Sequence, residues 1–413
     1  MLNKRRIVIT GVGVLAANGI GKEEFWSSLI AGRSGVGPIT LFDASRHPCQ
    51  IAGEVKNFDL PKLLGRPVKV KRLARQTQLA LAATHEALLD AHLPVAATDI
   101  PVERLPIFLG VSSSAIEVLE QGMERMATRG PAAVPMHSVL GCQPHQAASI
   151  ISEFFPVINH TATISSACAA GLDAIGAAYS QLRQGRYEIA LAGGADAPIC
   201  PLSYAGLATA GLLTRRNDDP EHASLPFDLR HDSGVIGEGA GVVVLETLEH
   251  ARARGCPWYL EVTGYATQMD PDATQPGSGF EMTMVAVLAH AGKRPTDIGM
   301  VSAHGPGHPV LDVVETVAIK AVLGQHAYQI PVVSIKAVTG NPLAAGGALQ
   351  VIACALGMQA GLVPPTANLE FPDPACDLDY VPCVGRRMQV DCCLINSHGL
   401  GGGNSSVIVE RVK

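Results

Sequence analysis

Short apolar runs alternate along the chain with longer segments whose apolar positions recur at helical spacing. Short β-branched runs are typical of buried strands, and the longer alanine-rich segments are typical of helices. This alternation favours an α/β fold with mostly parallel sheets covered by helices. We predict strands at Ile7 to Val14, Ile107 to Val111, Thr161 to Ser165, Ile189 to Ala192, Gly241 to Leu245, Tyr259 to Thr263, Met300 to Ala303, Val332 to Ile335, Cys392 to Asn396 and Ser406 to Val409.

A strand, short loop and small-residue helix occur in corresponding order in the two halves of the chain. The first unit ends in Cys168 and continues into a helix from Ala169 to Arg183. The second passes Lys336 and Asn341 before a helix from Pro342 to Met358. We therefore predict two related halves, residues 1–253 and 254–413, joined by a linker at Leu248 to Pro257.

The helix after Cys168 is rich in alanine and glycine, so it cannot form an amphipathic surface stripe and is expected to be central and tightly packed. The composition agrees, with 47% hydrophobic residues, 4% aromatic residues and 43 glycines in 413 residues. Such a chain can bury a large core from small aliphatic side chains and close backbone contacts.

Charge and cysteine usage exclude several classes of protein. The net charge of −6 gives no general footprint for nucleic acid. Lys4-Arg5-Arg6 and the apolar run after it imitate a secretory signal, but Gly11 and Gly13 interrupt that run, which favours a first buried strand. No other apolar stretch is long enough to cross a membrane. The ten cysteines show no CxxC pair and no disulfide spacing, so we expect a cytoplasmic protein without a metal site.

Cys168 is the strongest candidate for chemistry. A thiol at a helix N-terminus faces unpaired backbone N–H groups and the positive end of the helix dipole, which favour the thiolate. The same N–H groups can bind the oxyanion of a thioester under attack. Cys354, in contrast, lies within an apolar helical pattern and is interpreted as packing.

Polar residues follow two other predicted strands. His304 comes directly after the strand Met300 to Ala303 and precedes a glycine, which suits an acid, base or hydrogen-bond donor beside the nucleophile. Lys336 and Asn341 occupy the turn of the second unit, where Asn341 could alternatively be a helix N-cap.

Five segments in order resemble the signature blocks of β-ketoacyl-acyl-carrier-protein synthases of the elongating, type II fatty-acid and polyketide kind. They match over essentially the whole chain and are Ser165 to Gly171, Pro226-Phe227-Asp228 with Gly237 to Gly241, Ala303-His304-Gly305, Ser334 to Lys336 with Thr339-Gly340, and Gly399 to Asn404.

This resemblance implies a thiolase-like fold of two pseudo-duplicated α/β halves in a layered αβαβα sandwich. It implies that an acyl carrier protein delivers the acyl group to Cys168 on its phosphopantetheine arm, with no further cofactor. The oxyanion hole would be the backbone N–H groups of Cys168 and Leu400, and Glu315 would pair with Lys336. The protein would be a homodimer or a heterodimer with a sister subunit.

The chain departs from the family pattern at several positions. Asn341 stands where a second active-site histidine is expected, and an amide can still donate to an enolate oxygen. Pro306 and His308 replace two threonines that would hold the carrier arm.

The remaining departures concern the pocket. Aromatic residues are missing from its mouth at Gly234, His398 and Leu400, and Ser113 would replace a larger residue at its floor. Loss of rings predicts a wider, wetter entrance for a bulky or polar acyl group.

Three functions remain compatible with these residues. The first is a ketosynthase that condenses the acyl group on Cys168, by decarboxylation of a malonyl thioester, in polyketide or fatty-acid-like biosynthesis. The second is an acyltransferase that moves the acyl group to an oxygen or nitrogen nucleophile. The third is a non-elongating partner subunit, against which the intact cysteine counts.

Overall fold

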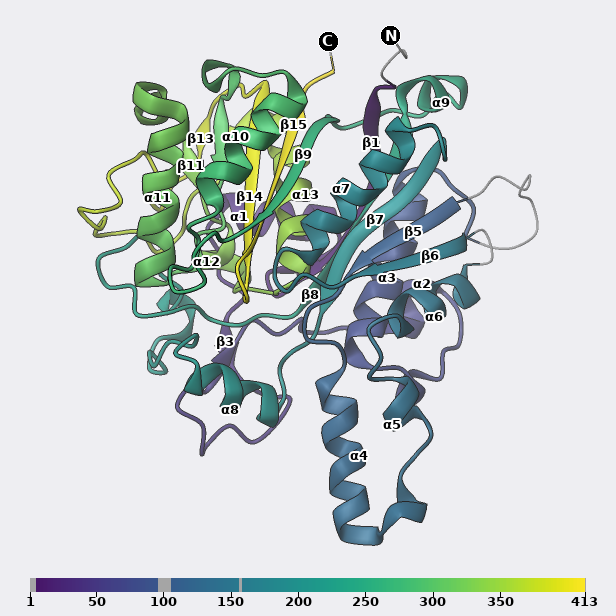
Figure 1. The fold of residues 1–413 in the computed structure, drawn as a ribbon. Helices are drawn as coiled ribbons and strands as arrows, with labels where there is room; N and C mark the ends of the chain where they lie inside the picture. The colour runs from purple at the N-terminus through teal and green to yellow at the C-terminus, as the bar shows by residue number, and fades with distance from the viewer. Residues whose placement is uncertain (1–4, 96–104, 156–157, 413) are drawn as a thin grey trace.

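The computed structural model describes residues 5–95, 105–155 and 158–412. Its centre is one 11-stranded mixed sheet, ordered β11-β10-β14-β15-β9-β1-β8-β7-β5-β6, with β2 paired to β1 (Figure 1). The strands of this sheet are β1 Ile7–Ala16, β2 Gly19–Ile20, β5 Leu105–Gly110, β6 Ile158–Ile164, β7 Ile189–Asp196, β8 Gly239–Thr247, β9 Glu261–Met269, β10 Met300–Ser302, β11 Val332–Val333, β14 Cys392–Gly399 and β15 Gly403–Glu410.

Thirteen helices are found in the described residues, and two short hairpins lie outside the main sheet. The hairpins pair β3 Gly37–Pro38 with β4 Ile51–Ala52, and β12 Leu362–Val363 with β13 Arg386–Arg387. The helices are α1 Lys22–Ile30, α2 Leu60–Leu64, α3 Arg75–Asp90, α4 Ile116–Arg129, α5 His137–Leu140, α6 Gln146–Phe154, α7 Ala170–Arg183, α8 Pro201–Thr209, α9 Leu248–Ala253, α10 Phe280–Ala291, α11 Pro309–Leu323, α12 Lys336–Thr339 and α13 Ala345–Ala360.

The two halves repeat one topology. Counting the main strands of each half along the chain, both run first, fifth, fourth, second, third across the sheet: β1-β8-β7-β5-β6 and β9-β15-β14-β10-β11. Parallel and antiparallel pairs also correspond at each step. Strands β1 and β9 join the halves through antiparallel pairs. The predicted duplication is confirmed, whereas the boundary between residues 253 and 254 stays a prediction.

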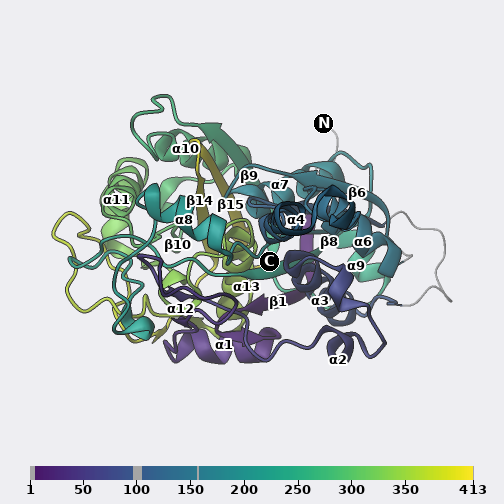
Figure 2. The ribbon, with the colours of Figure 1, turned by 90° about the horizontal axis from the view of Figure 1, so that it is seen from below.

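The two halves of this sheet form two β layers, and helices form three further layers, one between the halves and one on each outer face. Helices α3 and α6 pack on the outer face of the first half, and α10 and α11 on that of the second (Figures 1 and 2). Between the halves lie α7 and α13, which contact strands of both. Nearly all of α13 is buried, from Ala345 through Met358. The αβαβα sandwich and the central place of the helix after Cys168 are confirmed.

Small residues allow the two central helices to meet at backbone distance. A Cβ on Gly171 of α7 would lie 2.1 Å from the carbonyl oxygen of Ala344, just before α13. A Cβ on Gly194 of β7 would lie 2.3 Å from the same oxygen. Glycine at these positions lets α7 and β7 pack directly on the start of α13, which fixes the loops at both helix N-termini.

Three expectations from the sequence need correction. The sheet is mixed rather than mostly parallel, because β14 and β15 form a hairpin through a tight turn at positive-φ Gly401 and Gly402. The predicted linker contains α9, which Thr247 caps by accepting a hydrogen bond from the backbone N–H of His250. The second central helix begins at Ala345, later than expected, because Leu343 adopts a positive φ of 48° and interrupts it.

Within the described residues, no helix is both long and apolar enough to cross a membrane.

Candidate active site

Cys168 lies in the loop between β6 and α7, at the wall of a cavity of about 550 Å³. The preceding residue, Ala167, has a φ of 51°, an uncommon conformation for a residue with a Cβ. This sharp turn brings Cys168 to the end of the central helix, with its side chain 6% exposed. Strained backbone that the surrounding packing holds in place is common at functional sites.

Segments from both halves meet around this cavity. His304 follows β10, Asn341 follows α12, and His398 lies in β14; all three line the cavity with Cys168. Leu400, in the turn after β14, lines it as well. The structure therefore brings together the residues that the sequence singled out from four separate segments.

The backbone N–H groups of Leu400 and Cys168 lie close enough to the Cys168 thiol to lower its pKa. Burial, with a smaller contribution from Asp196, nevertheless raises the pKa of Cys168 to about 11, although Lys336 and these two N–H groups oppose the shift. The expected thiolate is therefore not favoured in the free protein, because desolvation outweighs the helix terminus. A neutral thiol needs a proton acceptor when it attacks a thioester.

His304 is 3% exposed, and its backbone is held by two charged residues. Lys336 donates a hydrogen bond to the His304 carbonyl oxygen. Glu315 accepts hydrogen bonds of 2.9 Å from the backbone N–H groups of His304 and Gly305. The expected pairing of Glu315 with Lys336 is electrostatic, since the charge of each shifts the pKa of the other, and both also hold the histidine loop.

Burial lowers the pKa of His304 well below its usual value, and the positive charge of Lys336 and the neighbouring His398 lower it further. The ring is therefore neutral near pH 7. Its Nδ1 is buried without a hydrogen-bond partner in the described part of the chain. A neutral imidazole in this position can act as a hydrogen-bond donor to a reacting oxygen.

Asn341 is half-buried and is held by its backbone and side chain. Its backbone N–H donates to the carbonyl oxygen of Val235 at 2.7 Å, and its carbonyl oxygen accepts from Gly237 at 2.9 Å. The side-chain oxygen accepts a hydrogen bond of 3.3 Å from the N–H of Leu343. Asn341 therefore acts as a local cap, which was the alternative role expected from the sequence. Its amide hydrogens remain available as donors at the cavity wall.

The predicted departures at the pocket mouth are explained by backbone packing. A Cβ on Gly234 would lie 2.9 Å from the carbonyl oxygen of Pro306, so the loop after His304 occupies the space of a larger side chain. His308 accepts a hydrogen bond of 3.2 Å from Val310 and caps α11. Ser113 does not line the cavity but donates to buried Asp196 at 2.9 Å.

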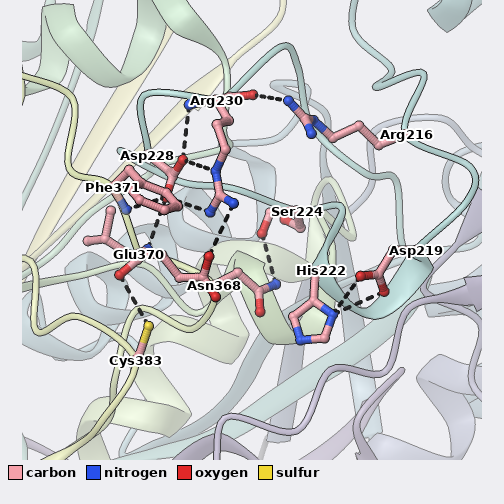
Figure 3. A network of polar contacts seen from close by, with 11 residues as sticks. Arg216, Asp219, His222, Ser224, Asp228, Arg230, Asn368, Glu370, Phe371 and Cys383 are labelled. Atoms are coloured by element: carbon pink, nitrogen blue, oxygen red, sulfur yellow. Dashed lines mark hydrogen bonds and ion pairs between the residues drawn. The ribbon is translucent and has the colours of Figure 1, made fainter.

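The Pro-Phe-Asp segment connects the two halves beside the site. Asp228 accepts hydrogen bonds from the Arg230 side chain and from the backbone N–H groups of Glu370 and Phe371 (Figure 3). Burial by itself would raise the pKa of Asp228. The hydrogen bonds have the larger effect, so the pKa of Asp228 is lowered. A second cavity of about 390 Å³ adjoins this network, and Arg230 is already engaged there by Asp228 and Glu370. We interpret the network as structural.

His231 and Asp312 connect the same segment to the histidine loop. Asp312 accepts from the backbone of Phe227 at 2.8 Å and of Gly307 at 3.2 Å. The His231 ring lies 3.2 Å from both Asp312 and Asp373. Sequence reasoning missed this cluster, because nothing in the order of these residues indicates that they meet.

Two family models match the chain. Residues 4–251 match "Beta-ketoacyl synthase, N-terminal domain" and residues 259–370 match "Beta-ketoacyl synthase, C-terminal domain". A 3-oxoacyl-[acyl-carrier-protein] synthase 2 of Synechocystis is 38% identical over 99% of both chains. The tetracenomycin polyketide synthase ketoacyl synthase alpha subunit of Streptomyces glaucescens is 37% identical over 99% of this chain and 98% of its own.

Solved structures agree with these sequence relatives. One is a type II polyketide ketosynthase, solved in complex with its acyl-carrier protein and bound to the hexaketide. It has a TM-score of 0.90 at 32% identity, and the match covers 99% of this chain and 100% of that chain. The ishigamide ketosynthase/chain length factor has a TM-score of 0.91 at 32% identity over the same shares.

Proposed function

The chain belongs to the β-ketoacyl synthase family, and from that premise we propose that it is a ketosynthase of polyketide or fatty-acid-like biosynthesis with Cys168 as its acyl acceptor. The observation that carries the assignment of roles is the cavity itself. Cys168, His304 and Asn341 line it together, and the backbone N–H groups of Cys168 and Leu400 face the nucleophilic sulfur.

In the loading step, the Cys168 sulfur attacks the carbonyl carbon of the incoming thioester. The negative charge that develops on the carbonyl oxygen would be stabilised by the two backbone N–H groups, which need no movement to donate. The carrier thiol leaves and takes up a proton, so that an acyl thioester on Cys168 replaces the Sγ–H bond.

In the condensation step, a malonyl thioester loses CO₂ and its thioester oxygen becomes that of an enolate. His304 and Asn341 would donate hydrogen bonds to this oxygen. The enolate carbon then attacks the acyl carbonyl, and the Cys168 sulfur leaves as a thiolate that takes up a proton from solvent to restore the thiol. Lys336 and Glu315 are positioning residues in this proposal, since both hold the His304 backbone.

The substrate would arrive on the phosphopantetheine arm of an acyl carrier protein, and the protein would need no cofactor of its own. The pocket mouth holds Pro306 and His308 where arm-binding threonines were expected. Neither the Pro306 ring nor the capped His308 Nδ1 offers a hydroxyl to the arm. Backbone groups at the pocket mouth would therefore contribute more than side-chain hydroxyls to recognition of the phosphopantetheine arm.

A second subunit would dock where β6 ends the sheet. Within the described residues β6 pairs with β5 alone, and α4, which projects away from the sheet in Figure 1, carries exposed Leu119, Met123 and Met126. An open strand edge beside exposed apolar residues suits a protein partner. We propose a homodimer or a heterodimer with a sister ketosynthase-like subunit, in the cytoplasm.

The acyltransferase reading differs in the fate of the acyl group. Replacement of aromatic residues by His398 and Leu400 at the mouth would leave room for an oxygen or nitrogen nucleophile, with His304 as general base. The positive charge of Lys336 opposes protonation of His304 and so weakens it as a base, which favours the ketosynthase. The non-elongating reading is opposed by the intact, cavity-lining Cys168.

Intact-protein mass spectrometry separates these functions. The protein is incubated with an acyl carrier protein thioester, and the added acyl mass is localised to Cys168 by peptide mapping. We expect the mass to persist until a malonyl carrier protein is added, and then to leave as a β-ketoacyl product. Loss of the mass to an alcohol or amine without malonyl donor would establish the acyltransferase instead.

A further inference from the structure

The cavity contains a second imidazole that the roles above do not use. His398 is 5% exposed, and its ring centroid lies 6.0 Å from that of His304. Its neighbours in β14 and the following turn both contact the nucleophile: Ser397 donates to the Cys168 carbonyl oxygen at 3.1 Å, and the Leu400 N–H faces the sulfur. His398 thus lies between two residues that approach the Cys168 loop, and it lines the same cavity as Cys168.

A chain of hydrogen bonds fixes the His398 tautomer. The Asn404 amide nitrogen donates to the carboxylate of Asp270 at 2.7 Å and to the carbonyl oxygen of Gly402 at 3.1 Å. Since both of these groups are acceptors, the Asn404 oxygen must face the other way, toward His398 Nδ1 at 3.1 Å. Nδ1 therefore carries the proton, and the lone pair is on Nε2.

The free nitrogen of His398 is available to the cavity. Burial lowers the pKa of His398, against smaller raising effects of Asn404 and Asp270, so the ring is neutral near pH 7. Among the residues that the structure describes, Nε2 has no protein partner, and it is not fully buried. It can therefore accept a proton from a group in the cavity.

His304 is suited to the opposite role. Its buried Nδ1 has no partner within the described residues, and the positive charge of Lys336 disfavours a proton there. The neutral ring then carries its proton on Nε2 and donates. One cavity thus holds a donor imidazole, His304, and an acceptor imidazole, His398.

We propose that His398 is the catalytic proton acceptor for the Cys168 thiol, with Asn404 and Asp270 as its positioning residues. The inference rests on the proposed function for the thioester that Cys168 attacks. As the Sγ–C bond forms, the Sγ–H bond breaks and its proton passes to His398 Nε2. The same proton then passes to the departing carrier sulfur, which leaves His398 neutral again. The titratable groups around His398 are Asp270 after β9, His304 after β10 and Cys168 before α7.

The test is single-turnover acylation of Cys168 by a small acyl thioester between pH 5.5 and 9.5, followed by intact mass. The wild-type rate should rise with the titration of His398 below pH 6.5 and then level off. In His398→Phe, which keeps a ring of similar size, loading at pH 7 should fall about 10²-fold or more. It should then rise about tenfold per pH unit, because the rate depends on thiolate formed from a thiol of high pKa.

Two further variants separate proton transfer from packing. His398→Ala should recover loading when imidazole is added, in proportion to its neutral form. Asn404→Leu keeps the His398 ring but removes the acceptor for Nδ1, so it should also slow loading and lose the plateau. The matched control is His145→Phe, which replaces an exposed histidine between α5 and α6. This variant should load like wild type.

Loading of His398→Phe at the wild-type rate with an unchanged plateau overturns the proposal. The proposal is also overturned if the His398 variants load slowly but keep the wild-type pH profile and imidazole does not restore loading of His398→Ala. The His398 ring would then contribute only to packing. Condensation by pre-acylated wild-type protein is measured separately with malonyl donor. Its absence would refute the ketosynthase function but not the role of His398 in loading.

Discussion

Ser397 donates a hydrogen bond of 3.1 Å to the carbonyl oxygen of Cys168, across 229 residues of sequence. This contact attaches the end of β14, in the second half, to the nucleophile loop of the first. The turn after β14 then brings the Leu400 N–H to the sulfur. The site consequently depends on the packing of one half against the other.

Cys168→Ala should abolish acyl loading and leave the fold intact. The substitution removes a sulfur from the cavity wall and adds no volume, so the free energy of unfolding should change by about 1 kcal/mol or less. Intact mass after incubation with an acyl carrier protein thioester measures loading, and thermal unfolding checks the fold. Acylation of another residue at the wild-type rate would mean that the nucleophile is wrongly assigned.

Asn341→Ala should reduce condensation while loading of Cys168 is largely preserved. Removal of one donor to a developing oxyanion costs about 2.7–4 kcal/mol, or about 10²–10³ in rate. In the proposed mechanism, the loading oxyanion would be bound by the backbone N–H groups of Cys168 and Leu400 rather than by the amide. The two steps are followed separately by mass and by product formation. Asn341→His supplies another donor and should retain part of the activity, whereas undiminished product from Asn341→Ala would favour the acyltransferase.

Charge reversal at Lys69 and Arg72 should slow loading from an acidic carrier protein. Both are exposed, at the 3₁₀ turn Val70–Arg72, and they are candidates for docking on the basis of the sequence, as are Lys62, Arg66, Lys71 and Arg125. The effect should appear in the association rate and diminish with added salt. Loading from a small thioester is the control. If both donors slow equally, the residues support the fold rather than docking.

Gly171→Ala should destabilise the protein strongly, because the new Cβ would lie 2.1 Å from the carbonyl oxygen of Ala344. Overpacking typically costs about 1–3 kcal/mol, and more where backbone is the obstacle. Gly206→Ala is the matched control in exposed helix α8, where a Cβ meets nothing within 4 Å. It should be neutral or stabilising by up to about 1 kcal/mol. Denaturant unfolding of both variants measures the difference.

His231 should stabilise the protein more in acid than in base. Burial opposes protonation of His231, but Asp312 and Asp373 outweigh it and the pKa is raised. A raised pKa contributes stability that is fully present below the unfolded value near 6.5 and is lost as pH rises through the folded pKa. The difference in unfolding free energy between wild type and His231→Asn should therefore shrink above pH 6.5. A difference that grows with pH would contradict the assignment of a protonated ring.

The sequence by itself determined the fold class, the repeated halves and the candidate residues for the chemistry. Apolar periodicity located the main strands, and the small residues after Cys168 required a central helix, because they cannot cover a surface. The order of the signature blocks identified the family over the whole chain. These features are local, or repeat along the chain, so they can be read without the tertiary structure.

Only the tertiary structure decided the ionisation and partnership of those residues. The helix terminus near Cys168 suggested a thiolate, but burial and Asp196 raise the thiol pKa instead. Lys336 and Glu315 both hydrogen-bond to the His304 backbone, and the charge of each also shifts the pKa of the other. Asp270, Asn404 and His398 come together because β9, β15 and β14 are neighbours in the sheet. Desolvation and hydrogen bonds depend on which distant segments pack together, and local sequence does not specify that.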